Sequence, residues 1–143
     1  MNLVLGQSEQ VCLWIAQRVP YFTPDPRMAA IGVARDKLIA GVAYHSYQPE
    51  VGDIQVTLAA DHPSWAQPGV VARLMEFPFV QLECRRASAF VARKNKRSRR
   101  WIEGVGFKME GKVRRGLPDD DLIGYGLLRE EAERFLKRLS NGR

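Results

Sequence analysis

Two segments of the chain carry residue types that could bind an anion. Segment 63–71, Pro-Ser-Trp-Ala-Gln-Pro-Gly-Val-Val, places small side chains and Gly69 directly before an apolar helical pattern. Free backbone N–H groups and the helix dipole make the start of a helix attractive to phosphate. Segment 93–100 has six basic residues in eight. Together the segments indicate a phosphate-bearing ligand, but many α/β loops contain a proline and a glycine, and a basic helix face can simply be solvated.

The net charge of +6 is concentrated in the second half of the chain. Residues 1–80 carry five basic and seven acidic side chains, whereas residues 81–143 carry seventeen basic and nine acidic ones. A positive field of this kind attracts anions. The charge distribution therefore favours phosphates, nucleic acid or an acidic cofactor as partners.

Length and composition are typical of one globular domain. The chain has 143 residues, of which 45% are hydrophobic and 27% charged, so we expect a single domain over residues 1–143. No apolar run approaches the ~18 residues of a membrane span, and the start lacks a secretory pattern. We therefore expect a cytoplasmic protein without membrane contact. Cys12 and Cys84 lie in apolar helical patterns, which favours reduced core side chains over a disulfide scaffold.

The motifs of several common enzyme classes are missing from the sequence. It has no zinc-ligand spacing, no dinucleotide-binding glycine fingerprint and no P-loop, so we expect no metal, NAD or ATP. It also has no Gly-x-Ser-x-Gly nucleophile elbow, which argues against a serine hydrolase of that type.

Apolar periodicity and turn residues predict the elements that position these segments. We expect helices over residues 8–19, 69–82, 95–105 and 129–139. We expect strands over residues 1–5, 28–35, 38–47, 53–60, 87–92, 107–115 and 121–128. Ser8 and Asn95 are the predicted N-caps of the first and third helices. Pro78 lacks the N–H that would bond back to Leu74, so the second helix should kink there. This order predicts a mixed α/β layer fold.

The position of the expected anion-binding site follows from one unit of the chain, formed by strand 53–60, helix 69–82 and strand 87–92. Such a crossover joins two parallel neighbours and is almost always right-handed. Its helix begins at the carboxyl end of the first strand, and the basic segment follows the second. Both anion-binding segments are therefore predicted on one edge of the sheet. On the basic helix, the expected buried residues are Ser98, Trp101, Ile102 and Val105, and the expected outward ones are Lys96, Arg99, Arg100 and Glu103.

The basic segment and the residues after it resemble the GCN5-related N-acetyltransferases, the GNAT superfamily. Asn95-Lys96-Arg97-Ser98 and the stretch Glu103-Gly104-Val105-Gly106-Phe107-Lys108-Met109-Glu110-Gly111 are similar to the family segment Asn-x-x-Ser … Glu-Lys-x-Gly-Phe-x-x-Glu-Gly. The likeness is greatest to the ribosomal-protein-type N-acetyltransferases and their bacterial and phage relatives, and the element order is similar over nearly the whole chain. The resemblance implies an α/β (α+β) fold, GNAT-like, with a mixed, mostly antiparallel sheet, a central parallel strand pair and helices on both faces.

Segment 63–71 departs from the family pattern Pro-x-x-Arg/Gln-x-x-Gly-x-Gly/Ala. Pro63 and Gly69 are kept, but Ala66 stands at the Arg/Gln position, with Gln67 beside it. Val71 replaces the last small residue, and a second proline at position 68 removes one backbone donor. The resemblance nevertheless implies acetyl-CoA as cosubstrate. The cofactor-binding residues that it implies are Ala66, Gln67, Gly69, Val70, Val71, Ala72, Asn95, Arg97 and Arg100.

The resemblance also implies transfer of an acetyl group to a primary amine, a reaction that needs a base and often an acid. The position of the tyrosine that serves as acid in many members holds Ile102 here. The predicted catalytic residues are Asp53, at a family-like place for an acidic residue, Ser98, in the motif, and Tyr125, on the last strand. Asp53 can equally be a solvated strand-end charge, and Ser98 a helix-start residue.

Two histidines and a group of aspartates are further candidates. His45 could act through water, since histidine has an unperturbed pKa near neutrality, and His62 could contact an anion or solvent. A cationic amine would approach near residues 20–26 and the hairpin 107–128. The aspartates that could attract it are Asp25, Asp53, Asp119, Asp120 and Asp121.

Alternatives to an active enzyme remain open. The departures at Ala66, Val71 and Ile102 favour a catalytically degenerate binding or structural module with the same fold, of the kind that phage could encode. The basic second half favours a nucleic-acid or tRNA-directed protein instead. The acceptor, a small-molecule or peptide amine, is not fixed by the sequence, and the exposed edge strands of this fold are compatible with a homodimer.

Overall fold

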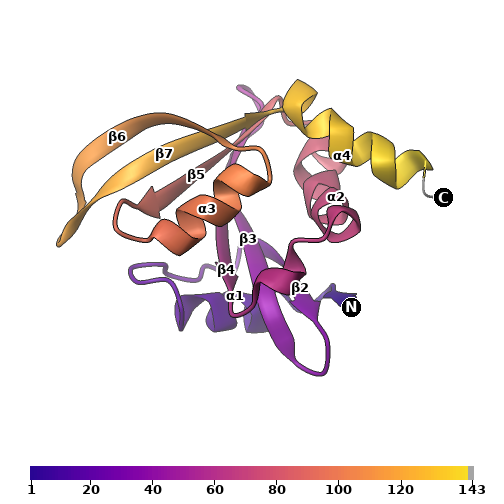
Figure 1. Cartoon of the computed structure of the whole chain (residues 1–143), viewed down its shortest axis with the longest axis horizontal. Helices are drawn as coiled ribbons and strands as arrows, with labels where there is room; N and C mark the ends of the chain where they lie inside the picture. The colour runs from indigo at the N-terminus through magenta and orange to yellow at the C-terminus, as the bar shows by residue number, and fades with distance from the viewer. Residues whose placement is uncertain (142–143) are drawn as a thin grey trace.

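The computed structural model describes the backbone of residues 1–141 and the side chains of residues 1–137. Among the strands described, which have the order β1-β2-β3-β4-β5-β7-β6, only β4 and β5 run parallel to each other (Figure 1). The strands are β1 (Asn2–Val4), β2 (Ala29–Ala34), β3 (Leu38–Gln48), β4 (Asp53–Ala60), β5 (Arg86–Ala92), β6 (Lys108–Leu117) and β7 (Asp120–Leu128). The expected mixed, mostly antiparallel sheet with a central parallel pair is confirmed.

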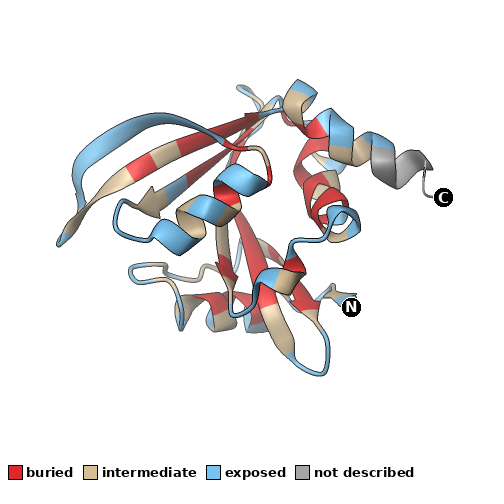
Figure 2. Ribbon diagram, in the orientation of Figure 1, coloured by how far each residue is buried: buried red, intermediate tan, exposed pale blue. Residues whose placement is uncertain are grey.

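Helices cover both faces of this sheet. The helices are α1 (Ser8–Ala16), α2 (Pro68–Glu76), α3 (Lys96–Gly104) and α4 (Arg129–Asn141), with a 3-10 turn η1 (Pro63–Trp65) and a π-helical turn η2 (Phe77–Gln81). One face packs small residues such as Ala43 and Ala59 against α1. The other face packs Tyr44 and Ile54 into the larger core that α2 helps to close. Much of α2 is accordingly buried (Figure 2). No α-helix in the described part of the chain combines the length and hydrophobicity that crossing a bilayer demands.

Two helices differ from expectation in detail. Ser8 is the first residue of α1 and not its N-cap, which is Gln7. The Ser8 hydroxyl instead accepts a hydrogen bond from the Ala30 N–H of β2 at 3.0 Å, so it joins the helix to the sheet. The second helix changes at Phe77 into the π-helical turn η2, which contains Pro78. This agrees with the expected irregularity, because proline cannot make the bond that continues an α-helix.

The parallel strands β4 and β5 pair only at their first residues. Their register covers Asp53 with Arg86, Ile54 with Ala87, and Gln55 with Ser88. Beyond Gln55, β4 stays paired with β3 as far as Ala60, and beyond Ser88, β5 stays paired with β7 as far as Ala92. The two strands therefore diverge, as Figure 1 shows, and the sheet opens between them.

Candidate active site

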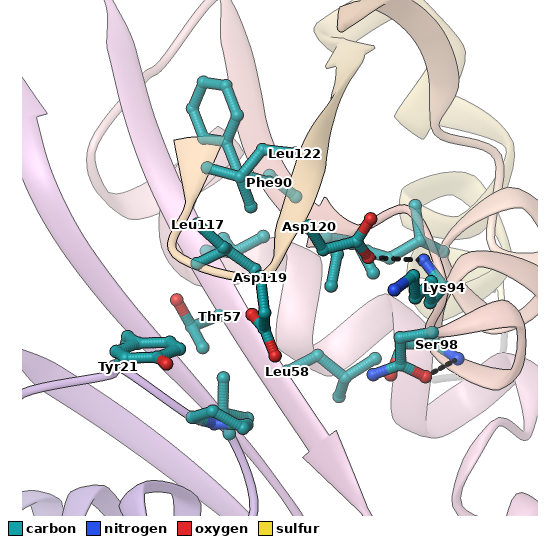
Figure 3. Close-up of a pocket in the computed structure, with 18 residues that line it drawn as sticks. Tyr21, Thr57, Leu58, Phe90, Lys94, Ser98, Leu117, Asp119, Asp120 and Leu122 are labelled. Atoms are coloured by element: carbon teal, nitrogen blue, oxygen red, sulfur yellow. Dashed lines mark hydrogen bonds between the residues drawn. The ribbon is translucent and has the colours of Figure 1, made fainter. Parts of the chain in front are cut away.

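A cavity of about 440 Å³ lies where β4 and β5 diverge (Figure 3). The β4 wall is Val56, Thr57 and Leu58, and the β5 wall is residues 89–92. The remaining walls come from the segment after α1, from α3 and its preceding loop, and from the β6–β7 turn. Their residues are Val19, Pro20, Tyr21, Lys94, Asn95, Ser98, Ile102, Leu117, Asp119, Asp120 and Leu122.

Three polar side chains of this cavity come from separate parts of the chain. Figure 3 shows Tyr21, Thr57 and Asp119 pointing into the same region of the cavity. Tyr21 has a left-handed backbone, with φ of 68°, which a bulky residue adopts only when its surroundings enforce it. The Asp119 carboxylate has no hydrogen-bond or ion-pair partner among the described residues. It is therefore available to a cationic ligand.

The neighbouring Asp120 has a structural role in the site. Its carboxylate accepts hydrogen bonds from the N–H groups of Lys94 and Asp121, each at 2.8 Å. These bonds, led by the one from Lys94, hold the pKa of Asp120 below its usual range. Asp120 thus ties the β6–β7 turn to the loop before α3. Among the described residues, no group of three or more His, Cys, Asp and Glu side chains could hold a metal ion.

Of the three predicted catalytic residues, the structure brings only Ser98 to the cavity. Asp53 lies at the closed end of the strand gap, where its Oδ1 accepts a hydrogen bond from Ser88 Oγ at 2.8 Å. The same carboxylate faces Arg86 Nε at 3.5 Å, and Arg86 pairs with Glu110 at 2.6 Å. This network links β4, β5 and β6 at the point where the gap begins.

Tyr125 is buried on β7, and its hydroxyl lies outside the cavity lining. The hydroxyl donates to Glu103 Oε2 at 2.6 Å and accepts from Arg99 Nε at 3.0 Å. Burial is the main cause of a raised Tyr125 pKa. Glu103 is exposed and Arg99 half-buried, on the expected outward side of the helix. Both side chains nevertheless bind this hydroxyl and so hold α3 on the sheet.

The start of α2 offers fewer donors than the family pattern. Pro68 has no N–H, and the Val71 N–H donates to the Gln67 carbonyl at 2.9 Å. The N–H groups of Gly69 and Val70 have no backbone partner in the described chain, as expected for the first turn of a helix. Ala66, Gln67 and Gly69 are exposed, Val70 is half-buried, and Val71 and Ala72 are buried.

The basic helix is tied to the end of β4. Arg97 Nη2 donates to the Asp61 carbonyl at 3.0 Å, and its guanidinium lies 4.6 Å from the centre of the Trp101 ring. Trp101 in turn packs edge-on against Trp65 of η1 at 6.3 Å. These contacts bring segments 63–71 and 93–100 to one edge of the sheet.

The other two predicted residues of this segment differ in surroundings. The Asn95 side chain accepts a hydrogen bond from the Ser98 N–H at 3.1 Å, as an N-cap does, and Asn95 also lines the cavity. Arg100 is exposed, and its guanidinium has no partner in the part of the chain that the structure describes. Its charge is free to act on a ligand.

Sequence reasoning missed Thr57, which lines the cavity, and the contact that it makes. Thr57 Oγ1 lies 2.8 Å from His45 Nε2 on the neighbouring strand β3. The alternation of side chains along the two strands could have indicated this contact. Thr57 pairs with Ala43 across the ladder, and His45, two residues after Ala43, lies on the same face of the sheet as both. Of the other candidates, Asp25 lines a separate cavity with His45, and His62 caps η1 by accepting a hydrogen bond from the Ser64 N–H.

No family model matches the sequence, and no curated protein sequence matches it significantly. Solved structures do resemble it. A putative acetyltransferase from T. thermophilus is 24% identical, with a TM-score of 0.67, over 82% of this chain and 68% of that one. A point mutant of spermidine N-acetyltransferase SpeG from Vibrio cholerae is 14% identical, with a TM-score of 0.70, over 96% and 99%. A chimera of SpeG with hSSAT is 12% identical, with a TM-score of 0.73, over 93% and 99%.

Proposed function

We propose that this chain, which has the fold of the GCN5-related N-acetyltransferases, transfers the acetyl group of acetyl-CoA to a primary amine. One observation carries the proposal: the parallel strands part after three register pairs and leave a cavity between them. Segment 93–100 contributes Lys94, Asn95 and Ser98 to the wall of this cavity, and its Arg97 binds the Asp61 carbonyl, close in sequence to segment 63–71. A phosphate-bearing donor held by these two segments and an amine could therefore reach one space from different sides.

The residues at the start of α2 and in the basic segment 93–100 fit a pyrophosphate. A Cβ at Gly69 would meet no atom within 4 Å, so a ligand can approach the backbone there, and the N–H groups of Gly69 and Val70 are free to donate. Arg97 and Arg100 add positive charge. With its oxygen used by Ser98, Asn95 can still donate from its amide nitrogen to the pantetheine.

The acceptor side of the cavity fits a cation. Asp119 supplies a carboxylate without a partner in the described chain, and Tyr21 and Thr57 supply a ring and a hydroxyl beside it. A primary amine is an ammonium ion at neutral pH, so this wall can attract it before reaction. The acceptor that we propose is therefore an amine of a small molecule or peptide.

The chemistry requires a neutral amine beside the thioester. The amine nitrogen bonds to the carbonyl carbon, the carbon–sulfur bond breaks, and the thiolate takes up a proton. Ser98, on the cavity wall, is the hydroxyl that we propose as hydrogen-bond donor to the departing sulfur. Holding both reactants in one cavity supplies much of the acceleration, because the reaction becomes effectively unimolecular.

Calorimetric titration with acetyl-CoA tests the proposal, with desulfo-CoA and ATP as comparison ligands. We expect micromolar binding by the wild-type chain and loss of binding in Gly69→Glu, because the new carboxylate would occupy the phosphate position. Gly104→Glu is the matched control, since Gly104 is also an exposed helical glycine with no atom within 4 Å of its Cβ position. Equal affinity in Gly69→Glu would place the phosphates elsewhere. No binding by the folded wild type would favour a catalytically inactive module.

A second candidate function, nucleic-acid binding, is favoured by one observation. All residues of β6 except the last are exposed, and the strand carries Lys108, Lys112, Arg114 and Arg115. Contact with duplex phosphates should make affinity fall steeply with salt, by about 0.9 in the log–log slope for each phosphate neutralised. Titration with a labelled duplex at several salt concentrations tests this, and a flat response would exclude it.

A further inference from the structure

Thr57, in the wall of the cavity, is hydrogen-bonded to a histidine behind it, and no role has yet been given to this pair. His45 Nε2 and Thr57 Oγ1 are 2.8 Å apart, across the antiparallel pair β3 and β4. Thr57 lines the cavity, and His45 does not. His45 therefore contacts a ligand in the cavity only indirectly, through the hydroxyl of Thr57. The ladder between β3 and β4 is irregular directly after His45, and such bulges commonly re-aim side chains beside active sites.

The surroundings of His45 leave it a suitable proton acceptor. The ring is half-buried and lies 6.1 Å from the ring of Phe22. Burial lowers the pKa of His45, so the imidazole is neutral at neutral pH. Its Nδ1 lies 3.3 Å from Ser46 Oγ. With the Nδ1 proton donated to that oxygen, the lone pair of Nε2 faces the Thr57 hydroxyl.

The charged groups near this pair are few. Asp25 and Arg27 line a neighbouring cavity together with His45, and they form an ion pair with each other at 3.0 Å. The hydroxyls of Tyr44 and Tyr47, on the same strand as His45, donate to the carbonyls of Leu74 and Leu82. On the cavity side of Thr57, Asp119 is the carboxylate that faces the ligand space (Figure 3).

We infer that Thr57 and His45 form a proton path that deprotonates the acceptor amine. The ammonium gives a proton to Thr57 Oγ1 while the Thr57 hydroxyl gives its own proton to His45 Nε2, so the amine becomes neutral and His45 becomes an imidazolium. The amine then attacks the thioester carbonyl, the carbon–sulfur bond breaks, and the second amine proton passes to the thiolate. The imidazolium returns its proton to water. This inference rests on the acetyltransferase function proposed above.

In this arrangement Thr57 contacts the acceptor and His45 is a positioning residue that acts through it. The two other titratable candidates are occupied elsewhere. Asp53 accepts from Ser88 and faces Arg86, and the Tyr125 hydroxyl is shared by Glu103 and Arg99. Asp119 has a separate task, which is to hold the ammonium by its charge.

The first test needs no turnover. Nitrogen-15 NMR of the imidazoles identifies the tautomer of His45, assigned by comparison with His45→Gln. We expect a neutral ring at pH 7, with the proton on Nδ1 and a bare Nε2, and a changed Nε2 shift in Thr57→Val. A proton on Nε2, or an imidazolium at pH 7, would overturn the path whatever the activity of the protein.

The second test is the pH dependence of kcat/KM, with acetyl-CoA and spermidine, the amine named in the similar structures. Thr57→Val and His45→Gln should lower kcat by about 10²-fold, the usual contribution of general base catalysis. Both should also remove the rise of kcat/KM with pH that reports the His45 pKa, which lies below the ordinary histidine value. Thr57→Ser should have the wild-type kcat and the wild-type rise of kcat/KM with pH. Asp119→Asn should raise KM for spermidine and leave the rise with pH in place.

The outcomes separate the two proposals. If the His45→Gln and Thr57→Val variants keep the wild-type kcat and the wild-type rise of kcat/KM with pH, the proton path is wrong although the enzyme function stands. If the folded wild type fails to bind acetyl-CoA in the calorimeter, the function is wrong, and the inference fails with it.

Discussion

Tyr125 of β7 donates its hydroxyl to Glu103 of α3 at 2.6 Å, across 22 residues of chain. Arg99 donates to the same oxygen at 3.0 Å. One buried phenol therefore fixes a full turn of the basic helix to the sheet. The position of α3 matters because its residues Ser98 and Ile102, and its N-cap Asn95, line the cavity.

Replacing Tyr125 with Phe should reduce stability and spare the reaction. The free energy of unfolding should fall by about 1–2 kcal/mol, because the variant loses hydrogen bonds to two charged groups. The transfer rate should stay within about twofold, since the hydroxyl lies outside the cavity. Denaturant titration and steady-state kinetics check the two parts. A rate loss without a stability loss would make Tyr125 a catalytic residue, as the sequence predicts.

Replacing Asp53 with Asn separates the two base candidates. The variant keeps an acceptor for the Ser88 hydroxyl but loses the charge that faces Arg86 at 3.5 Å. We expect a small loss of stability, of about 0.5 kcal/mol for a partly exposed pair, and a near wild-type rate. The check is kcat beside the unfolding free energy. A fall in kcat of about 10²-fold at unchanged stability would establish Asp53 as the base and exclude His45.

Replacing Arg100 with Gln should weaken acetyl-CoA binding without changing stability. Arg100 is exposed and unpaired among the described residues, so its loss should lower affinity by about two- to fivefold, as for other exposed charge pairs. The effect should shrink at high salt because the phosphates are then screened. Arg35→Gln, in the turn between β2 and β3, is the matched control. Equal losses of affinity in Arg100→Gln and Arg35→Gln would indicate that the net positive charge of the protein attracts acetyl-CoA and that Arg100 makes no local contact with it.

Tyr44 should make the protein sensitive to alkali. Its buried hydroxyl donates to the Leu74 carbonyl at 2.6 Å, and burial raises its pKa well above the ordinary value near 10. The folded chain keeps this proton where the unfolded chain loses it, so stability is complete below about pH 10 and falls as pH rises further.

The Tyr44→Phe variant tests this pH dependence. It should cost about 1 kcal/mol at neutral pH, from the lost hydrogen bond, and lose stability less steeply above about pH 10. Tyr125, whose pKa is also raised, should leave part of the slope in place. Denaturant midpoints at neutral and alkaline pH give both quantities. An unchanged slope would show that the Tyr44 phenol does not control alkaline unfolding.

Much of the fold could be predicted from local pattern. The sequence predicts a strand over 53–60, and β4 spans Asp53–Ala60, because its β-branched residues and flanking turns are local signals. Asn95 caps α3 as expected. The predicted N-cap at Ser8 is wrong by one residue, since helix boundaries depend on tertiary contacts such as the bond from Ala30.

The site was less predictable because its contacts join distant residues. Helical periodicity indicates the direction of Arg99 and Glu103 but cannot supply the hydroxyl that draws both toward β7. The separation of β4 from β5 after Gln55 follows from competing pairings in the whole sheet, which no short window of sequence contains. The cofactor and acceptor roles, and the likeness to the ribosomal-protein type, stay predictions.

Strand β6 closes one side of the sheet with an exposed, unpaired backbone edge. Such edges act as templates for other strands and promote aggregation. Here the ladder with β7 is interrupted twice, after Met109 and after Val113, and the exposed strand carries Lys108, Lys112, Arg114 and Arg115. Irregular pairing and like charges both discourage stacking of one chain on another. The basic strand that could serve a ligand therefore also opposes the edge-to-edge pairing of two copies of the chain.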